Sequence, residues 1–67
     1  MFKVKVLEGP ELVYCEYFGT LQAAKEDFNS QLDYIAGEKC YDPELQALKF
    51  IVVMSDASEK ILESVNA

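Results

Sequence analysis

The side chains in this sequence that could carry out covalent chemistry are two cysteines and twelve carboxylates, in a chain without histidine. A cysteine nucleophile needs a base and an electropositive setting that hold its thiol as the thiolate. Cys15 and Cys40 have no histidine or arginine to provide either, and the net charge of the chain is -6. We therefore expect no cysteine-dependent catalysis. Both cysteines are expected to be buried, reduced thiols, with a disulfide between them as the alternative.

The other residue types indicate neither a catalytic site nor a cofactor site. The glycines lie apart at positions 9, 19 and 37, so the chain has no glycine-rich phosphate loop. A structural zinc site has four thiolate or imidazole ligands, and two thiols are too few. Carboxylate pairs occur by chance in a chain with twelve acids, and 67 residues rarely form a deep cleft around them. We expect no metal, no cofactor and no enzyme activity.

Carboxylates that share one surface can instead attract a partner. In the helical segment described below, at about 100° per residue, Glu26, Ser30 and Asp33 stack on the side away from the apolar stripe. Asp27 and Tyr34 line the adjacent edge of that helix. Tyrosine is a stiff amphipathic anchor, and carboxylates steer a basic partner. The pattern predicts a partner-binding surface, and an ordinary solvated helix face is the alternative.

A second candidate surface lies on the predicted N-terminal hairpin. Leu7, Leu12 and Tyr14 are expected on its outer face. There the three side chains would form a modest apolar patch unless something covers them. This patch is the alternative partner-binding site.

The charge balance limits the class of partner. Six lysines oppose twelve carboxylates, and arginine is absent. A nucleic-acid-binding protein normally presents a basic stripe to the phosphates, and anionic membranes repel an acidic surface. We therefore expect a protein partner with a basic surface, no direct nucleic-acid binding and no membrane binding. Acidity that serves only solubility is the alternative.

The ends and the apolar runs of the chain indicate a soluble, cytoplasmic protein. Residues 1–6 alternate lysine with apolar side chains, which is unlike the basic-then-apolar order of a signal peptide. The longest apolar run, residues 50–54, is too short to cross a bilayer. Reduced cysteines fit the same compartment.

Residues 2–18 have the pattern of an antiparallel β-hairpin. Residues 2–6 alternate in the period of a half-buried strand, and residues 12–18 are rich in β-branched and aromatic side chains. A one-residue slip would exchange the faces of the second strand. Placing Leu7 opposite Leu12 gives chemically consistent pairs along the whole hairpin. This register predicts an inward, buried Cys15.

Residues 21–36 are predicted to form a helix that packs across the inner face of this hairpin. Apolar side chains recur there at intervals of three or four, from Leu21 to Ile35. Thr20 is a suitable N-cap, and Gly37 is expected to end the helix in the left-handed conformation.

The last third of the chain is predicted to add one buried strand. The Asp-Pro pair at residues 42–43 indicates a single short turn of helix, and residues 49–54 form an apolar, β-branched run. For residues 56–66, Asp56 and Glu59 resemble a capping box and favour a terminal helix, with a strand as the alternative. The predicted fold is a two-layer α+β domain, ββαβ(α), that spans residues 1–67 as one unit.

These observations together favour a binding module over an enzyme. We expect a stand-alone protein that acts in trans, an inhibitor or adaptor of the kind encoded by small phage or mobile-element genes, which occludes a basic surface of its partner. A self-assembling structural subunit is the alternative, because a small core and an apolar hairpin face both favour homo-oligomers. A regulatory domain that binds a small ligand is a second alternative.

Overall fold

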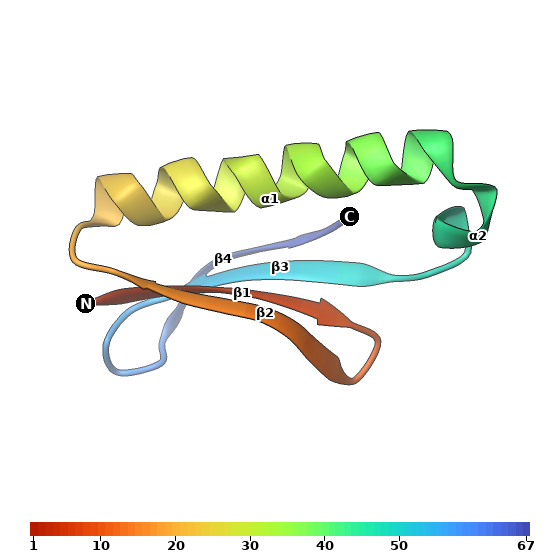
Figure 1. Ribbon diagram of the computed structural model, residues 1–67. Helices are drawn as coiled ribbons and strands as arrows, with labels where there is room; N and C mark the ends of the chain where they lie inside the picture. Colours follow the sequence, from red (N-terminus) through yellow and green to blue (C-terminus); the bar gives the residue numbers. More distant parts are fainter.

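A four-stranded antiparallel sheet carries one long helix on one of its faces in the computed structural model, which describes residues 1–67 (Figure 1). The elements follow in the order β1 (Phe2–Glu8), β2 (Glu11–Phe18), α1 (Leu21–Tyr41), α2 (Pro43–Gln46), β3 (Phe50–Ser55) and β4 (Ile61–Asn66). The sheet order is β2-β1-β3-β4, so β1 and β3 are central and β2 and β4 are the edges. The predicted two-layer α+β fold is confirmed.

The core lies between α1 and the two central strands. Alternate residues of β1 and β3 point toward the helix, and they meet an apolar stripe of α1, as strand and helix periodicities require. The buried cluster consists of Val4, Val6, Ala24, Phe28, Ile35, Val52 and Met54. Phe28 is only 2% exposed and lies near the middle of α1.

α1 begins at the predicted cap but continues beyond the predicted end. The Thr20 hydroxyl accepts a hydrogen bond from the Ala23 N–H at 3.2 Å, which confirms the N-cap. Gly37 does not end the helix, which runs to Tyr41. A glycine inside a helix costs only about 1 kcal/mol, a penalty that the contacts of the following turn can offset. The prediction of a stop at Gly37 was therefore wrong.

Asp42 joins the two helices. Its N–H donates to the Glu38 carbonyl at 3.0 Å and closes α1. Its side chain accepts from the Glu44 N–H at 3.0 Å and caps α2, whose first residue is Pro43. The short helix predicted from the Asp-Pro pair is confirmed.

The hairpin register contains a β-bulge that reverses part of the predicted pattern. Leu7 pairs with Leu12 as predicted, but Val6 pairs with Tyr14, so Val13 is an extra residue in β2. From Tyr14 onward every side chain of β2 therefore lies on the face opposite to the predicted one. Tyr14 faces the helix, and Cys15 lies on the outer face opposite Lys5. The predicted inward, buried Cys15 was wrong.

The chain ends in a strand, so the predicted terminal helix was also wrong. β4 pairs with β3 from Ile51 to Ser55. The Asp56 carboxylate does cap main-chain N–H groups, but they are those of Ser58 and Lys60, both at 2.9 Å, in the turn between the two strands. A strand here satisfies the hydrogen-bonding groups along the second edge of β3, which a terminal helix would leave unpaired.

Candidate functional site

The outer side of α1 carries the predicted acidic strip. Glu26, Ser30 and Asp33 are all exposed there, one helical turn apart along the helix. Tyr34 lies beside them with 64% of its surface exposed. Four of the five predicted residues thus form a continuous surface, and their role in binding stays a prediction.

Asp27, the fifth residue, turns away from this strip toward the sheet. Its carboxylate accepts a hydrogen bond from the Tyr14 hydroxyl at 2.8 Å, and this bond ties α1 to the edge strand β2. Burial, and to a lesser extent this hydrogen bond, raises the pKa of Tyr14 to about 12. Asp27 and Tyr14 are therefore part of the fold and are not available as free contact residues.

The raised pKa of Tyr14 predicts a loss of stability at alkaline pH. An unfolded tyrosine loses its proton near pH 10, whereas the folded Tyr14 keeps it to about pH 12. The contribution of Tyr14 to the free energy of unfolding is therefore complete below pH 10 and is lost as the pH rises through 12. Between pH 9 and 12, the parent should lose about 1 to 2 kcal/mol more unfolding free energy than Tyr14→Phe. Urea unfolding at both pH values measures this difference. Tyr41→Phe, at a position 90% exposed, should behave like the parent, and equal losses in all three proteins would contradict the assignment.

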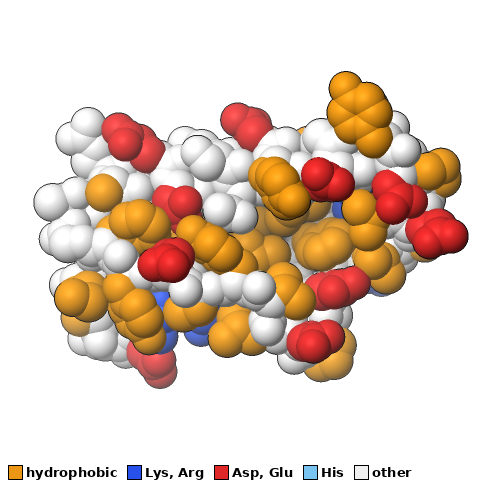
Figure 2. All heavy atoms as spheres, viewed as in Figure 1, with side chains coloured by type: hydrophobic (Ala, Val, Ile, Leu, Met, Phe, Trp, Pro, Cys, Tyr) orange, Lys and Arg blue, Asp and Glu red, His pale blue; other side chains and the backbone are white.

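An apolar groove lies next to Tyr34, where the C-terminal half of α1 meets α2 and the start of β3. Its volume is about 170 Å³. The groove is lined by Tyr34, Ile35, Glu38, Lys39, Leu45 and Phe50. Figure 2 shows hydrophobic side chains in a hollow between the helix and the sheet, with acidic side chains on both sides of it. The groove continues the exposed surface of Tyr34 into a concave apolar surface.

One carboxylate lines this groove, and two more lie on the same side of the sheet. The lining carboxylate is Glu38. Glu8 lies opposite Phe50 in the β1–β3 ladder, and Glu11 lies opposite Glu8 in the β1–β2 ladder, so both belong to the helix-facing side of the sheet. None of the three forms a salt bridge. Their charges therefore add to the negative potential on the helix side of the sheet, where the groove lies.

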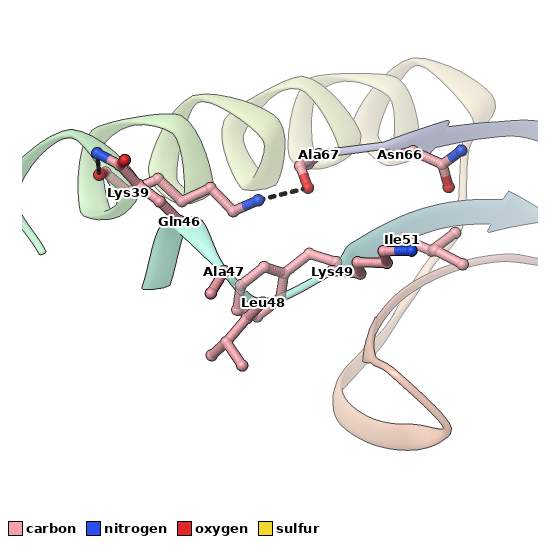
Figure 3. Close-up of a pocket in the computed structure, with 9 residues that line it drawn as sticks. Lys39, Gln46, Ala47, Leu48, Lys49, Ile51, Asn66 and Ala67 are labelled. Atoms are coloured by element: carbon pink, nitrogen blue, oxygen red, sulfur yellow. Dashed lines mark hydrogen bonds between the residues drawn. The ribbon is translucent and has the colours of Figure 1, made fainter. Parts of the chain in front are cut away.

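Lys39 is the basic residue of the groove, but its amine is engaged within the protein. Nζ donates to the main-chain oxygen of Ala67 at 2.8 Å (Figure 3). The amine also lies 5.5 Å from the centre of the Phe50 ring, within cation–π range. Gln46 donates to the Lys39 carbonyl at 3.0 Å and holds α2 against α1. Lys39 thus fixes the wall of the groove and forms no salt bridge with the lining carboxylate, Glu38.

The larger depression drawn in Figure 3 shares Lys39 and Phe50 with the groove and lies beside the ends of β3 and β4. Its volume is about 420 Å³. No carboxylate or cysteine lines it, so it offers no pair of groups for acid–base catalysis. In the whole structure, no three His, Cys, Asp or Glu side chains come together in a way that could hold a metal ion.

The alternative hairpin patch is divided between the two faces of the sheet. Leu7 and Leu12 pair directly on the outer face, and 52% of Leu12 is exposed. Tyr14 lies on the opposite face and packs against the core. The patch is divided because Val13 is an extra residue in β2, which places the side chains of Leu12 and Tyr14 on opposite faces of the sheet. The prediction that the three residues form one surface was wrong.

The two cysteines differ from the prediction in their exposure. Cys15 is half-buried, Cys40 is exposed in the last turn of α1, and both thiols are free. The expectation of two buried thiols was wrong, since the bulge moved Cys15 outward and the longer helix placed Cys40 in solvent.

Comparison with protein families, with curated proteins and with solved structures found no match. None of the helices is both long enough and apolar enough to cross a membrane. The description of the site therefore depends on its own geometry.

Several residues of the groove were not predicted from the sequence. Glu38 and Lys39 lie beyond the expected helix end, and Leu45 and Phe50 meet them only in the folded chain. A signal for Glu8 was present, because the strict alternation of β1 places it on the same face as Val4 and Val6.

Proposed function

We propose that this protein is a small acidic protein-binding module that acts in trans and occludes a basic surface of its partner. The observation that carries this proposal is the apolar groove beside Tyr34, which is lined by one carboxylate, Glu38, and lies on the acidic helix side of the sheet, where Glu8 pairs with the groove residue Phe50. A concave apolar surface supplies affinity, and the surrounding charges supply orientation and selectivity.

The size of the groove suggests what part of a partner it holds. A cavity of about 150 Å³ accommodates a benzene-sized group, and the groove has a volume of about 170 Å³. One large apolar side chain of the partner would therefore enter it. Tyr34, 64% exposed at its edge, would lose its contact with water on binding and act as the anchor.

The charges suggest what surrounds that side chain in the partner. Glu26 and Asp33 extend the acidic surface along α1, and the chain as a whole carries a net charge of -6. Lysine or arginine residues that flank the entering side chain would meet this surface, and a long-range field would accelerate the encounter. The same field disfavours direct contact with nucleic acid or with an anionic membrane. A protein of this kind would act as an inhibitor or adaptor.

Selection from a random displayed peptide library tests this proposal. The parent protein is the target, and the variant Tyr34→Ala with Glu38→Gln is used for counter-selection. We expect enriched peptides with one large apolar residue flanked by Lys or Arg, and NMR shift changes on binding that centre on Tyr34, Leu45 and Phe50. Peptides without basic residues, or peptides that bind the variant equally well, would reject the proposal.

A further inference from the structure

The face of the sheet opposite α1 is uncovered and carries more apolar than polar side chains. Figure 1 shows both helices on one side of the sheet and no element on the other. Residues directly opposite one another in an antiparallel sheet share a face, so the ladders identify the side chains on this outer face. Its apolar members are Leu7, Leu12, Cys15, Tyr17, Ile51, Val53 and Ile61, and its polar members are Lys3, Lys5, Ser55, Ser64 and Asn66. Of the larger ones, Leu12, Tyr17 and Ile61 are each more than half exposed.

The outer face is also the part of the sheet without carboxylates. The four carboxylates of the strands are Glu8, Glu11, Glu16 and Glu63, and all lie on the helix side. Glu8, Glu16 and Glu63 each pair with a helix-facing residue, and Glu11 pairs with Glu8. The two strand lysines, Lys3 and Lys5, lie on the outer face instead. The pleat therefore separates the charges, and the acidic surface of the molecule is on the helix side.

The lysines of the outer face are partly neutralised. Lys3 forms a salt bridge with Glu59 in the turn before β4 at 2.8 Å, and its amine lies 5.7 Å from the centre of the Tyr17 ring. The hydrogen bond from Lys3 holds the pKa of the Glu59 carboxyl below its usual range. Lys5 is half-buried between Cys15 and Val53 and has no ion-pair partner. The outer face thus has one uncompensated positive charge, that of Lys5, and no strand carboxylate, on a strongly acidic protein.

The two edges of the sheet are poor sites for strand addition. β2 carries its extra residue at Val13, and β4 carries one at Leu62, which has no partner between Glu63 and Ile61 in the β3–β4 ladder. Bulges on edge strands hinder pairing with another chain. An association of sheets would therefore use the outer face and not an edge.

From these observations we infer that the outer face of the sheet binds a second copy of this chain, in a two-fold symmetric dimer packed sheet to sheet. In this arrangement the acidic helix sides of both copies point away from each other, which keeps the repulsion between two chains of charge -6 low. A contact through the outer side of α1 would instead bring Glu26 and Asp33 of both copies together. Two-fold dimers are also the commonest homo-oligomers.

The broad side of the domain has the dimensions of a standard protein interface. The principal extents of the chain are 36 × 22 × 15 Å, so a rectangle of roughly 800 Å² encloses this side, which matches the area per partner of a standard interface. The isolated chain buries only nine of its 67 residues, and a small core gains most from association. The resulting dimer would present one groove on each of its outer sides.

Analytical ultracentrifugation over a range of protein concentrations tests the dimer. The parent should sediment as a species of twice 7.6 kDa. Leu12→Glu with Ile61→Glu places two carboxylates on exposed positions of the outer face and should give a folded monomer, with folding checked by circular dichroism. Tyr41→Glu, at the 90% exposed position on α1, is the matched control and should remain a dimer. A parent that is monomeric at every concentration up to the millimolar range overturns the proposal.

The two cysteines supply a second readout that does not depend on carboxylate substitutions. Cys15 lies on the outer face and Cys40 on the helix, so each can be labelled alone in the Cys40→Ser or the Cys15→Ser variant. Raising the protein concentration through the dimerisation range should slow the labelling of Cys15 by a thiol reagent roughly tenfold and leave the rate at Cys40 unchanged. A dimer in which Cys15 reacts at the same rate as in the monomer would use another surface and would overturn the sheet-to-sheet arrangement.

Discussion

Phe28→Ala is expected to lower the free energy of unfolding by about 3 to 5 kcal/mol, the usual range for removing a buried phenylalanine. Phe28 is 2% exposed and lies in the cluster that joins α1 to both central strands. The whole stability of a chain of 67 residues is only roughly 3 to 10 kcal/mol, so this variant is expected to be partly or fully unfolded at room temperature. Circular dichroism and urea unfolding measure the effect.

Two companion variants separate the loss of packing from other effects. Phe28→Leu keeps most of the buried volume and should cost roughly 1 to 2 kcal/mol. Leu21→Ala, at a position of the same helix that is 38% exposed, should cost less than Phe28→Ala. A Phe28→Ala protein that melts within a few degrees of the parent would show that α1 does not pack on the sheet through this residue.

Tyr34→Ala is expected to weaken binding of a groove-selected peptide, or of the natural partner, by about 2 kcal/mol, which corresponds to roughly a 30-fold loss of affinity. The loss should appear as faster dissociation, because contacts made after the encounter determine the lifetime of a complex. The fold should be unaffected, since Tyr34 is 64% exposed. Surface plasmon resonance measures both rates, and unfolding experiments check the fold.

The carboxylates of α1 should act on association instead. The triple variant Glu26→Gln, Asp33→Asn and Glu38→Gln should slow association about tenfold at low ionic strength and flatten its dependence on salt. Asp27 is left unchanged because its carboxylate accepts the Tyr14 hydrogen bond. If Tyr34→Ala and the triple variant bind as tightly and as quickly as the parent, the helix side is only a solvated surface.

The candidate site could be predicted in part. The helical spacing of Glu26, Ser30, Asp33 and Tyr34 was enough to place them on the outside of α1, because a regular helix sets the direction of every side chain. The groove beside Tyr34 could not be predicted, since its walls come from three elements that meet only after folding. The charge separation across the sheet was implicit in the alternation of β1 but depended on the register of β2, β3 and β4.

Local sequence was sufficient for the first strand, the Thr20 cap, the core stripe of α1 and the Asp42 cap of α2. Each depends on hydrogen bonds or side-chain periodicity within a few residues, so neighbours in the chain carry the information. The composition alone was sufficient for the acidic character of the chain, whose net charge is -6.

Long-range contacts decided the bulge at Val13, the continuation of α1 past Gly37 and the strand at Ile61–Asn66. In each case the local sequence preference was weak or ambiguous. A difference of about 1 kcal/mol in the conformational preference of a residue is smaller than the free energy gained from packing or from pairing an open strand edge. The Asp56 carboxylate illustrates the reason. It caps N–H groups as its sequence context suggests, but the unpaired edge of β3 makes the capped structure a turn between strands and not the start of a helix.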